Sequence, residues 1–550
     1  MNKRLKIGFL IDSDSINHSS YELIKFVASN KIFQKPIIIS GHTDQLEKIS
    51  LIRLYIKYPL YYFLMNIIQH FEKKSVVKNR PEQLQIYKLN DVGIFERLKV
   101  VGIWSKSKLF LSFTKEDLEK IKVLEFDVII RLGSGIITGE ILNTPKFGVL
   151  SMHHGDNRVN RGAPPGFWEV MNREPSTGFI IQKLTEELDG GHVLFRGNIP
   201  TANNWSLNRA RIRAKSTIFM QNLLLNLAKK NMLPKIQQSY LHDRSLLKLG
   251  HNSIILIKYI LKISIPIMLK KYMHLFIKKR IPNWEVSMSR SEIFRTSLWR
   301  FKIIEKPKHV FFADPFIMNH KDKKAIFVEE YAIDKKKGVI SALSVTEDSV
   351  EYLGNVIEED FHLSFPFVFS HKGKIFMIPD SSKKMEIRLY ECLDYPKKWK
   401  FIKTLMYNVD ASDTMVFKKS EAWYMLTNID SSRIGDHNSE LHVFYSNNIL
   451  SSEWLPIKSG NPVIFDSRKA RNGGYFHYKS DLYRVSQIHS GDRYGSGICI
   501  NKVGRLNKNT YKEESIQELY PEFVHQGLAL HHLNSRDGIT VYDFAKDYLK

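Results

Sequence analysis

Short, continuously apolar runs recur in the first 200 residues and alternate with longer stretches that have helical spacing. The runs occupy residues 6–11, 35–40, 126–133 and 148–153. Runs of this length without polar alternation are typical of strands buried on both faces, and their alternation with helices predicts βαβ units. We therefore expect a Rossmann-like α/β domain with a parallel sheet over residues 1–205.

From about residue 300 the pattern changes to short strands rich in aromatic and β-branched residues. Two apolar strands around a polar turn recur roughly every 50 residues. Five such units begin near Ala313, Ser364, Ser412, Asn472 and Gln526. With about four strands in each unit, this repeat predicts an all-β, five-bladed propeller over residues 291–550. A two-sheet sandwich is the alternative, although it would not require the recurring Asp/Ser-x-Phe motif.

The segment between these two domains, residues 206–290, is predicted to be a basic helical connector. Residues 201–300 hold 19 Lys+Arg and 3 Asp+Glu, so they account for +16 of the formal charge of +25. Apolar residues interrupted by lysines and by Pro266 fill 253–279, and 51–74 has a similar composition. Such helices suit an anionic membrane surface, where each basic residue contributes about 1 kcal/mol. The alternative is a packed connector whose lysines are merely solvated.

Composition narrows the class of protein. With 550 residues, 43% hydrophobic and 25% charged, the chain is several globular domains rather than disordered or collagen-like. Cys392 and Cys499 are its two cysteines, so we expect no disulfide framework, no metal site and a reducing compartment. The apolar stretch 7–11 is too short for a signal peptide, and no window suits a transmembrane helix. We expect a cytoplasmic protein that lies on the inner face of the membrane if it is peripheral.

Two segments after predicted strands carry candidate chemistry, because ligands of parallel sheets lie at the carboxyl ends of strands. Residues 151–170 form a Gly/Pro-rich loop with His153, His154 and two arginines, and residues 177–201 contain an acidic turn with Asp189. Taken alone, a histidine after a strand is usually structural, and Asp-Gly-Gly is usually a turn.

Together these motifs resemble the catalytic domain of the formyltetrahydrofolate-dependent formyltransferases, which act on glycinamide ribonucleotide, methionyl-tRNA and amino sugars. The family pattern is Asn-x-His, a loop that ends in Arg-Gly or Pro-Gly, a Thr-Gly strand and Leu-Asp-x-Gly. The matching residues here are Ser151-Met152-His153, Arg161-Gly162, Thr177-Gly178 and Leu188-Asp189-Gly190-Gly191. The step from Ser151 to Asp189 also matches the family's spacing.

The resemblance implies that His153 lies beside the formyl group of 10-formyltetrahydrofolate and that Asp189 orients its imidazole or carries the proton. It also implies that two segments bind the pterin ring through main-chain hydrogen bonds. Their residues are Leu132, Gly133, Gly135, Ile136, Ile137, Thr185, Glu186, Glu187 and Leu188.

Ser151 stands where the family has Asn, and its hydroxyl is a shorter, freely rotating donor. Loss of a good oxyanion donor costs about 10²-fold in rate. Either Ser151 serves in a slower reaction, or a donor such as His154 or Asn157 has replaced it, or the domain is inactive.

The C-terminal repeats resemble the propeller-like N-terminal domain of plant glucosamine inositolphosphorylceramide transferases, through the unit starts at Ala313 and Ser364 and the segments 467–474 and 482–495. The first unit start is also similar to five-bladed glycosidases that act on furanosides, in which acids line a central pocket. That analogy places five residues at the funnel: Asp314, Glu330, Asp380, Arg471 and Gln487. We expect a glycan-recognition or glycosidase-like domain, with a purely structural propeller as the alternative.

The function that these features favour is N-formylation of an amino sugar by 10-formyltetrahydrofolate, in surface polysaccharide biosynthesis. The amino sugar would be carried on a nucleotide, a lipid or a glycan, and no nucleic acid partner is expected beyond a nucleotide-sugar carrier. A carbohydrate-binding or glycan-processing protein with an inactive formyltransferase domain is the alternative. Formylation of methionyl-tRNA is the third reading, because the basic segment 201–300 also suits RNA.

Overall fold

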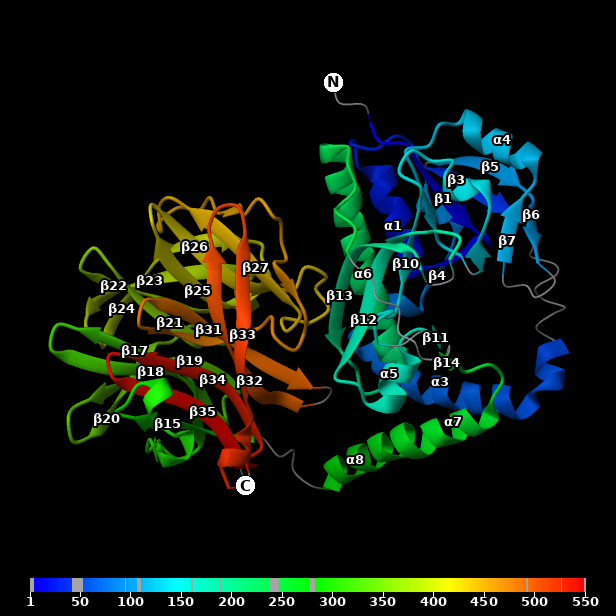
Figure 1. The fold of residues 1–550 in the computed structure, drawn as a ribbon. Coiled ribbons are helices and arrows are strands. Elements are labelled where there is room, and N and C mark those ends of the chain that lie inside the picture. Colours follow the sequence, from blue (N-terminus) through cyan, green and yellow to red (C-terminus); the bar gives the residue numbers. More distant parts are fainter. Residues whose placement is uncertain are drawn as a thin grey trace. The chain divides into compact units, whose positions relative to one another are not determined.

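The computed structural model divides the chain into two compact units, Met1–Tyr272 and Met273–Lys550 (Figure 1). It describes residues 4–41, 53–93, 95–105, 110–133, 135–159, 162–187, 190–237, 247–276, 282–490, 493–525 and 527–548. The finer division into domains 1–205, 206–290 and 291–550 stays a prediction.

The first unit is built on a seven-stranded sheet, as the apolar runs predict. The strand order is β13 (His192–Pro200), β12 (Ser176–Lys183), β10 (Val149–His153), β8 (Val128–Arg131), β1 (Ile7–Ile11), β3 (Ile37–Gly41) and β5 (Glu96–Val100). Strands β10, β8, β1, β3 and β5 are parallel, and β12 runs antiparallel to both of its neighbours. All the residues of β1 and β8 are buried. The expectation of a parallel Rossmann-like sheet is therefore confirmed.

Helices and a second, shorter sheet lie between and after the strands of this sheet in the chain order. The helices of this unit before residue 231 are α1 (His18–Ser29), α3 (Pro59–Asn79), α4 (Lys115–Val123), α5 (Phe167–Asn172) and α6 (Trp205–Lys230), of which α6 falls within the predicted connector. The same unit also contains a short sheet of β6 (Gly102–Trp104), β7 (Phe110–Phe113) and β9 (Ile136–Ile137). Helix α6 buries 15 of its 26 residues, so it is part of the core of this unit.

The basic connector forms a continuous helical rod with a π-helical turn. Helix α7 (Ser253–Tyr259) passes through Ile260–Ser264 into α8 (Ile265–Phe276). Pro266 has no N–H to donate to the carbonyl of Lys262, and this carbonyl accepts a hydrogen bond from Arg173 Nη2 at 3.0 Å instead. An external donor thus satisfies the group that the proline leaves free.

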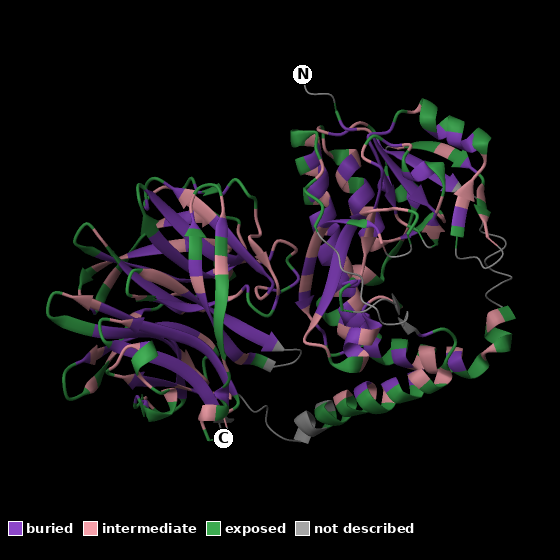
Figure 2. Cartoon of the chain, in the orientation of Figure 1, coloured by how far each residue is buried: buried purple, intermediate pink, exposed green. Residues whose placement is uncertain are grey.

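One face of this rod is buried and the other is not. Leu256, Tyr259 and Ile263 pack with Tyr61 and Ile68 of α3 in one hydrophobic cluster. The apolar side chains that remain more than one-third exposed on the rod are Ile254, Ile257, Leu261, Ile265, Met268, Leu269 and Tyr272. Figure 2 shows the contrast between the buried strands and these largely exposed helices. Among the described helices, none is long and apolar enough to cross a membrane.

The second unit contains antiparallel sheets that repeat one meandering strand order. The first two sheets are β17 (Val310–His320), β18 (Lys323–Ala332), β19 (Lys337–Val345) and β20 (Val350–Ile357), then β21 (Ser364–His371), β22 (Lys374–Asp380), β23 (Glu386–Asp394) and β24 (Lys398–Tyr407). The third is β25 (Ala411–Lys419), β26 (Ala422–Ile429), β27 (Glu440–Ser446) and β28 (Leu455–Pro456), with β29 (Ile464–Phe465) also on β27.

The last sheet combines the two ends of this unit. Its order is β16 (Lys302–Ile303), β15 (Pro282–Ser289), β35 (Ile539–Tyr548), β34 (Ala529–Arg536), β30 (Asn472–Tyr478), β31 (Asp481–Ser490), β32 (Arg493–Leu506) and β33 (Tyr511–Leu519). A single parallel pair, Phe476 with Ser535, joins β30 to β34. The C-terminal many-stranded sheet domain is confirmed, whereas its five-bladed arrangement stays a prediction.

Candidate functional site

The candidate site of the first unit lies where three neighbouring parallel strands end. Strands β1, β8 and β10 are adjacent and end at Ile11, Arg131 and His153. The Arg131 guanidinium, which is 4% exposed, contacts Asp12 Oδ1 at 2.5 Å. A Cβ added at Gly133 would lie 2.3 Å from Asp12 Oδ2, so a side chain at this position would force the ion pair to move. The ion pair therefore lies against the backbone at the start of the first predicted folate-binding segment.

Ser151 and His153 lie on the same face of β10, because side chains alternate along a strand. Ser151 pairs with Arg131 of β8 on one side and with Gln182 of β12 on the other. His153 pairs with Ile180. Both side chains are half-buried, and their shared face is consistent with joint action at one reacting group.

The two alternative residues in this loop each have a partner elsewhere in the unit. His154 Nε2 lies 3.0 Å from Ser216 Oγ of α6, and burial, with the charges of Arg213 and His153, lowers the pKa of His154 to about 3. Asn157 is 1% exposed, and its Oδ1 accepts a hydrogen bond from Arg196 Nη2 at 3.0 Å. Ser151 is the candidate donor that shares one face of β10 with His153.

Asp156 holds the loop after β10 against β13. Its carboxylate contacts the guanidinium of Arg196 on β13 and accepts hydrogen bonds from the Arg158 backbone N at 3.0 Å and Nη2 at 2.8 Å. Burial alone would raise the pKa of Asp156, but these bonds to Arg158, together with the charge of Arg196, lower it. Asp156 therefore carries a negative charge near neutral pH and keeps the loop in one conformation.

The two predicted folate-binding segments come together in the fold. The N–H of Gly139, just after β9, donates to Glu186 Oε1 at 2.9 Å, and the Leu184 N–H donates to Val149 O at 2.8 Å. These bonds bring Gly135, Ile136 and Ile137 toward Thr185, Glu186 and Glu187. Leu188 and Asp189, which carry the predicted acidic group, lie outside the described residues.

Two polar atoms beside these segments suit a bound ring with donors and acceptors. Thr185 Oγ1 and Gln182 Oε1 are buried and have no hydrogen-bond partner within the described part of the chain. An unpaired buried polar group costs about 1 to 3 kcal/mol. A ligand such as the folate pterin, with ring N–H and C=O groups, fits this requirement.

In the second unit, the first strand of each predicted repeat contains the same two-residue bulge. The bulged pairs are 314–315, 365–366, 413–414, 473–474 and 531–532. Three of the residues at the first position, Asp314, Phe365 and Asp413, have φ between +46° and +52°. Bulges re-aim side chains next to functional sites. Here they place acidic and histidine side chains at equivalent positions in different sheets.

These side chains form a buried polar cluster. Asp413 Oδ2 accepts hydrogen bonds from Arg471 Nε at 2.6 Å and Gln487 Nε2 at 3.2 Å. His531 Nδ1 lies 2.7 Å from Asp543 Oδ1, and its Nε2 lies 3.7 Å from Asp314 Oδ1. The half-exposed Tyr494 ring covers the guanidinium of Arg471 at 5.4 Å.

The predicted funnel residues divide into two groups. Asp314, Arg471 and Gln487 belong to the cluster, and the charge of Asp380 acts on Glu329 and Asp413 within it. The structure does not bring Glu330 there: its Oε2 accepts hydrogen bonds from Ser341 Oγ at 2.7 Å and Tyr352 OH at 2.6 Å. Adjacent residues of a strand face opposite sides, so Glu329 takes the place predicted for Glu330.

Sequence reasoning missed Glu329, Asp413, His531 and Asp543. Asp413 has a sequence signal, because it follows Ser412 in the third unit as Asp314 follows Ala313 in the first. His531 occupies the corresponding bulge of β34. The predicted start of the fifth unit, Gln526, lies five residues before this bulge, so the equivalence of His531 with Asp314 was not visible in the sequence. Asp543 lies opposite that bulge on β35 and could be found only from strand pairing.

The cluster holds more acidic groups than can ionise together. Burial alone would raise the pKa of Asp314, but the imidazoles of His532 and His531 lower it to about 2. Burial and the charges of Asp314 and Asp380 raise the pKa of Glu329 well above its usual value. Glu329 is therefore the group that keeps a proton, as in other sets of coupled carboxyls.

A cation is a second way to neutralise this cluster. Ligand atoms of Asp314, His531 and Asp543 all lie within 4.8 Å of one another. However, the contact between His531 Nδ1 and Asp543 Oδ1 is a hydrogen bond, so both atoms already have a partner. The expectation of no metal stays a prediction.

Glu329→Gln should make the second unit less sensitive to rising pH. Folding raises the pKa of this carboxyl above the usual 4.5. The contribution of its proton to the stability of the folded state is therefore fully present below pH 4.5 and is lost as the pH rises through the folded-state pKa. The neutral amide has no such loss. Calorimetry between about pH 5 and about pH 8 should show the wild-type Tm falling relative to that of E329Q. Glu330→Gln is the matched control and should keep the wild-type trend; parallel curves for E329Q and wild type would contradict the assignment.

Comparisons with known proteins match the two units separately. Residues 304–537 match the family model described as glucosamine inositolphosphorylceramide transferase 1, N-terminal. The protein of that name from Arabidopsis thaliana is 34% identical over 212 residues, which are 38% of this chain and 27% of that protein. Methionyl-tRNA formyltransferase of Clostridium tetani is 28% identical over 148 residues, 26% of this chain and 46% of that protein.

Among solved structures, an N-formyltransferase from Helicobacter canadensis, in complex with folinic acid and dTDP-3-aminofucose, is 10% identical. The match covers 56% of this chain and 94% of that chain, with a TM-score of 0.30. The chain thus spans less than half of the length of the curated relatives described above. The sequence matches and the sheet order together give the first unit a formyltransferase-like fold, followed by the region that matches the transferase N-terminal model.

Proposed function

We propose that this protein is an N-formyltransferase that moves a formyl group from 10-formyltetrahydrofolate to the amine of an amino sugar. The observation that carries the proposal is the position of His153 at the carboxyl end of β10, in the strand next to β8, after which the first predicted folate-binding segment begins. Ligands of open parallel sheets lie at this edge. The formyltransferase-like fold of the first unit supports formyl transfer as the chemistry of this edge.

In the proposed reaction the sugar amine attacks the formyl carbon, so a new C–N bond forms while the bond from that carbon to the folate nitrogen breaks. The proton lost by the amine passes to the departing folate nitrogen. His153 donates to the developing oxyanion or relays this proton, and Asp189 orients the imidazole or carries the proton. Ser151, on the same face of β10 as His153, supplies a second donor to the oxyanion.

The second unit is proposed to recognise the glycan through a five-bladed propeller. Five equivalent bulges and the pairing of β15 with β35 support the arrangement, since propellers close by joining strands from both ends of the domain. The Ile317 N–H of the first sheet donates to Asn534 Oδ1 of the last at 2.9 Å. The match to a glucosamine inositolphosphorylceramide transferase region supports a glycan-related role.

Methionyl-tRNA remains the second acceptor to test. Sequence matches to methionyl-tRNA formyltransferases favour it, and the strongly basic segment 201–300 suits RNA. The amino-sugar interpretation is preferred because the second unit adds a many-stranded domain, and its matched relatives are named glucosamine inositolphosphorylceramide transferases.

The first test follows formyl transfer by mass spectrometry from 10-formyltetrahydrofolate to a panel of amino-sugar nucleotides, lipid-linked amino sugars and methionyl-tRNA. His153→Ala and Asp189→Asn should each lower the rate by about 10²-fold or more, because each removes a proton-handling group. Ser151→Asn should keep or raise the rate, since the amide is the stronger fixed donor.

Val123→Ala, on the exposed surface of α4, is the control and should keep the wild-type rate. Wild-type rates in both the His153 and Asp189 variants would overturn the assignment. No product with any acceptor would favour the carbohydrate-binding alternative with an inactive first unit.

The second test asks whether the acceptor occupies the polar cluster. Arg471→Gln and Tyr494→Ala should raise the acceptor KM by about tenfold while leaving the folate KM unchanged, because a buried charged hydrogen bond contributes about 1.5 to 3 kcal/mol. Arg468→Gln, which removes a more exposed arginine three residues earlier, is the matched control. An unchanged acceptor KM in both cluster variants, with the fold confirmed by circular dichroism, would make the second unit a scaffold.

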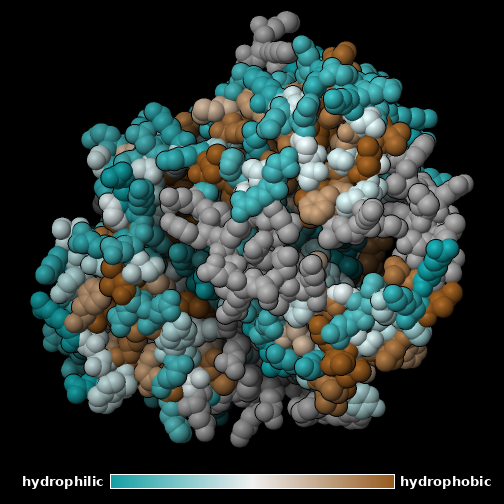
Figure 3. Space-filling model, turned by 45° about the vertical axis from the view of Figure 1, so that its right-hand side comes forward, coloured by the Kyte–Doolittle hydropathy of each residue, from teal (hydrophilic) through white to brown (hydrophobic). Residues whose placement is uncertain are grey.

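We also propose an anionic membrane surface as a partner of the first unit. Helix α3 and the rod pack together and expose apolar side chains, among them Phe63 (61%), Ile254 (64%) and Leu261 (60%). Figure 3 shows apolar residues on the surface of the molecule. Exposed lysines lie between them: Lys57, Lys73 and Lys74 on or near α3, and Lys258 and Lys262 on the rod. Apolar insertion and attraction to anionic lipid then act on the same face.

The third test is sedimentation with vesicles that contain phosphatidylglycerol. The protein should bind them at low salt and be released as salt rises, because the attraction of exposed charges is screened within about 8 Å at physiological ionic strength. Leu261→Gln with Leu269→Gln should reduce binding, whereas Val123→Gln, at an apolar residue that is 78% exposed on α4, should not. Equal recovery with neutral and anionic vesicles would favour a packed connector.

A further inference from the structure

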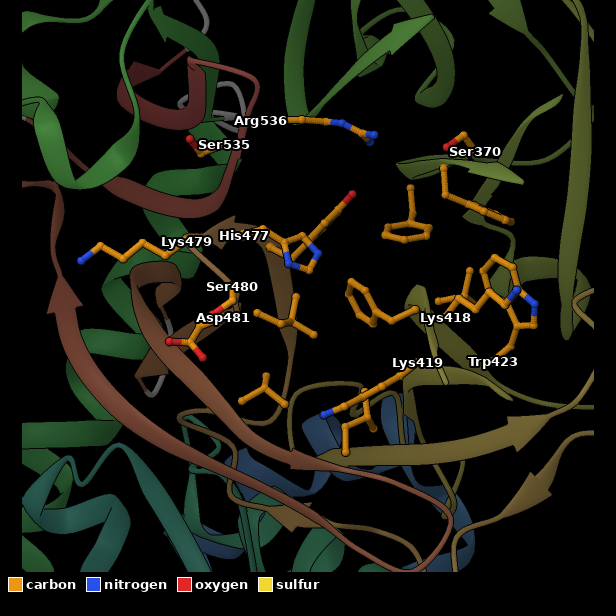
Figure 4. A pocket seen from close by; sticks show the side chains of 18 of the residues that line it. Ser370, Lys418, Lys419, Trp423, His477, Lys479, Ser480, Asp481, Ser535 and Arg536 are labelled. Carbon is orange, nitrogen blue, oxygen red and sulfur yellow. The ribbon is translucent and has the colours of Figure 1, made fainter. Parts of the chain in front are cut away.

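A cavity of about 910 Å³ opens at the opposite end of the strands that carry the bulges (Figure 4). On β25, for example, the bulge is at 413–414, and the pocket residues Lys418 and Lys419 end the strand. About five residues of extended chain separate them, roughly 16 Å. The cavity is therefore a separate place from the polar cluster, and its volume is in the range of ligand pockets.

The floor of this pocket is aromatic and rigid. Phe369, Phe417, Trp423 and Tyr475 line it, and each is less than 10% exposed. Trp423 packs against Phe369 with ring centres 5.6 Å apart, and Phe417 against Tyr475 at 5.2 Å. A floor that is already packed presents apolar ring surface without the cost of ordering it on binding.

The rim of the pocket is basic. Arg536 lies on one side of the space between His477 and Trp423 and Lys419 on the opposite side, whereas the amine of Lys479 is directed away from it (Figure 4). Burial and the charge of Arg536 lower the pKa of His477, so its imidazole is neutral and can donate or accept.

Each acidic residue of the lining has a partner. Asp481 pairs with Lys502 at 2.7 Å. Asp537 accepts a hydrogen bond from Asn319 Nδ2 at 2.6 Å and also lies 3.5 Å from Arg536 Nε, so it compensates part of the charge of Arg536. Glu292 contacts Arg295 at 3.4 Å. Lys419 is exposed and lines the pocket, and within the described chain its amine has no salt bridge.

We propose that this pocket binds a sugar that carries a phosphate ester, with the sugar ring on the aromatic floor and the phosphate at the basic rim to which Lys419 and Arg536 belong. Guanidinium and ammonium groups are the usual protein partners of phosphate, and aromatic faces suit the C–H side of a sugar ring. The pocket is closed by a floor, which suits a small headgroup rather than a polymer. This inference does not depend on formyl transfer, because it uses only residues of the second unit.

The test is isothermal titration calorimetry of the full chain with glucosamine 6-phosphate, glucosamine, inorganic phosphate and UDP-N-acetylglucosamine. Glucosamine 6-phosphate should bind more tightly than glucosamine or inorganic phosphate, because it fills both parts of the pocket. Lys419→Gln and Arg536→Gln should each weaken it by about tenfold or more. A higher affinity for UDP-N-acetylglucosamine than for the monoester would identify a nucleotide sugar as the source of the phosphate, and the reverse a phosphorylated glycan.

Lys321→Gln is the matched control, since Lys321 occupies the corresponding turn between β17 and β18 and does not line the pocket. It should bind glucosamine 6-phosphate as wild type does. His153→Ala should also bind normally, so a failed formyl-transfer assay and a failed binding assay are distinguishable. Equal affinities for glucosamine and glucosamine 6-phosphate, or wild-type affinity in both the Lys419 and Arg536 variants, would overturn the proposal.

Discussion

Burying an ionised side chain costs several kcal/mol unless partners compensate it, and this constraint decides where each unit keeps its polar residues. Glu72, buried on α3, accepts hydrogen bonds from the Ser206 N–H at the start of α6 and from Tyr259 OH at 2.5 Å. One carboxylate thus joins three helices and meets the positive end of the α6 dipole. Arg484, which is 0% exposed, is similarly held by Glu513 at 2.5 Å.

Sites arise where this compensation is incomplete. In the polar cluster of the second unit, Arg471 neutralises Asp413, while Glu329 faces other carboxylates and retains its proton. In the first unit, Thr185 Oγ1 is buried and has no partner within the described chain. The same rule that makes the core stable therefore marks these positions as places where a ligand would complete the set of contacts.

The two units reach this arrangement by different backbone devices. The first uses the edge of a parallel sheet. The neighbouring strands β1, β8 and β10 end at this edge, so the residues that follow them lie at the same side of the sheet. The second uses a bulge repeated in five strands, which turns single side chains such as Asp314 without breaking the sheet. The bulges lie near one end of these strands. The aromatic, basic pocket of the second unit lies at the other end. Two kinds of ligand chemistry can then share one set of strands.

The apolar runs of β1, β3, β8 and β10 were readable from the sequence, because strands buried on both faces must be continuously apolar. Strand β5 was not, since its edge position leaves a polar Glu-Arg-Leu-Lys-Val sequence. The spacing of Ser151, His153 and Asp189 likewise determined the resemblance to formyltransferases. Tertiary structure alone decided that Glu329 rather than Glu330 joins Asp314, and that Lys262 O meets Arg173. Periodicity follows from local geometry, whereas the face of a strand and the partner of a buried group depend on chains that are distant in sequence.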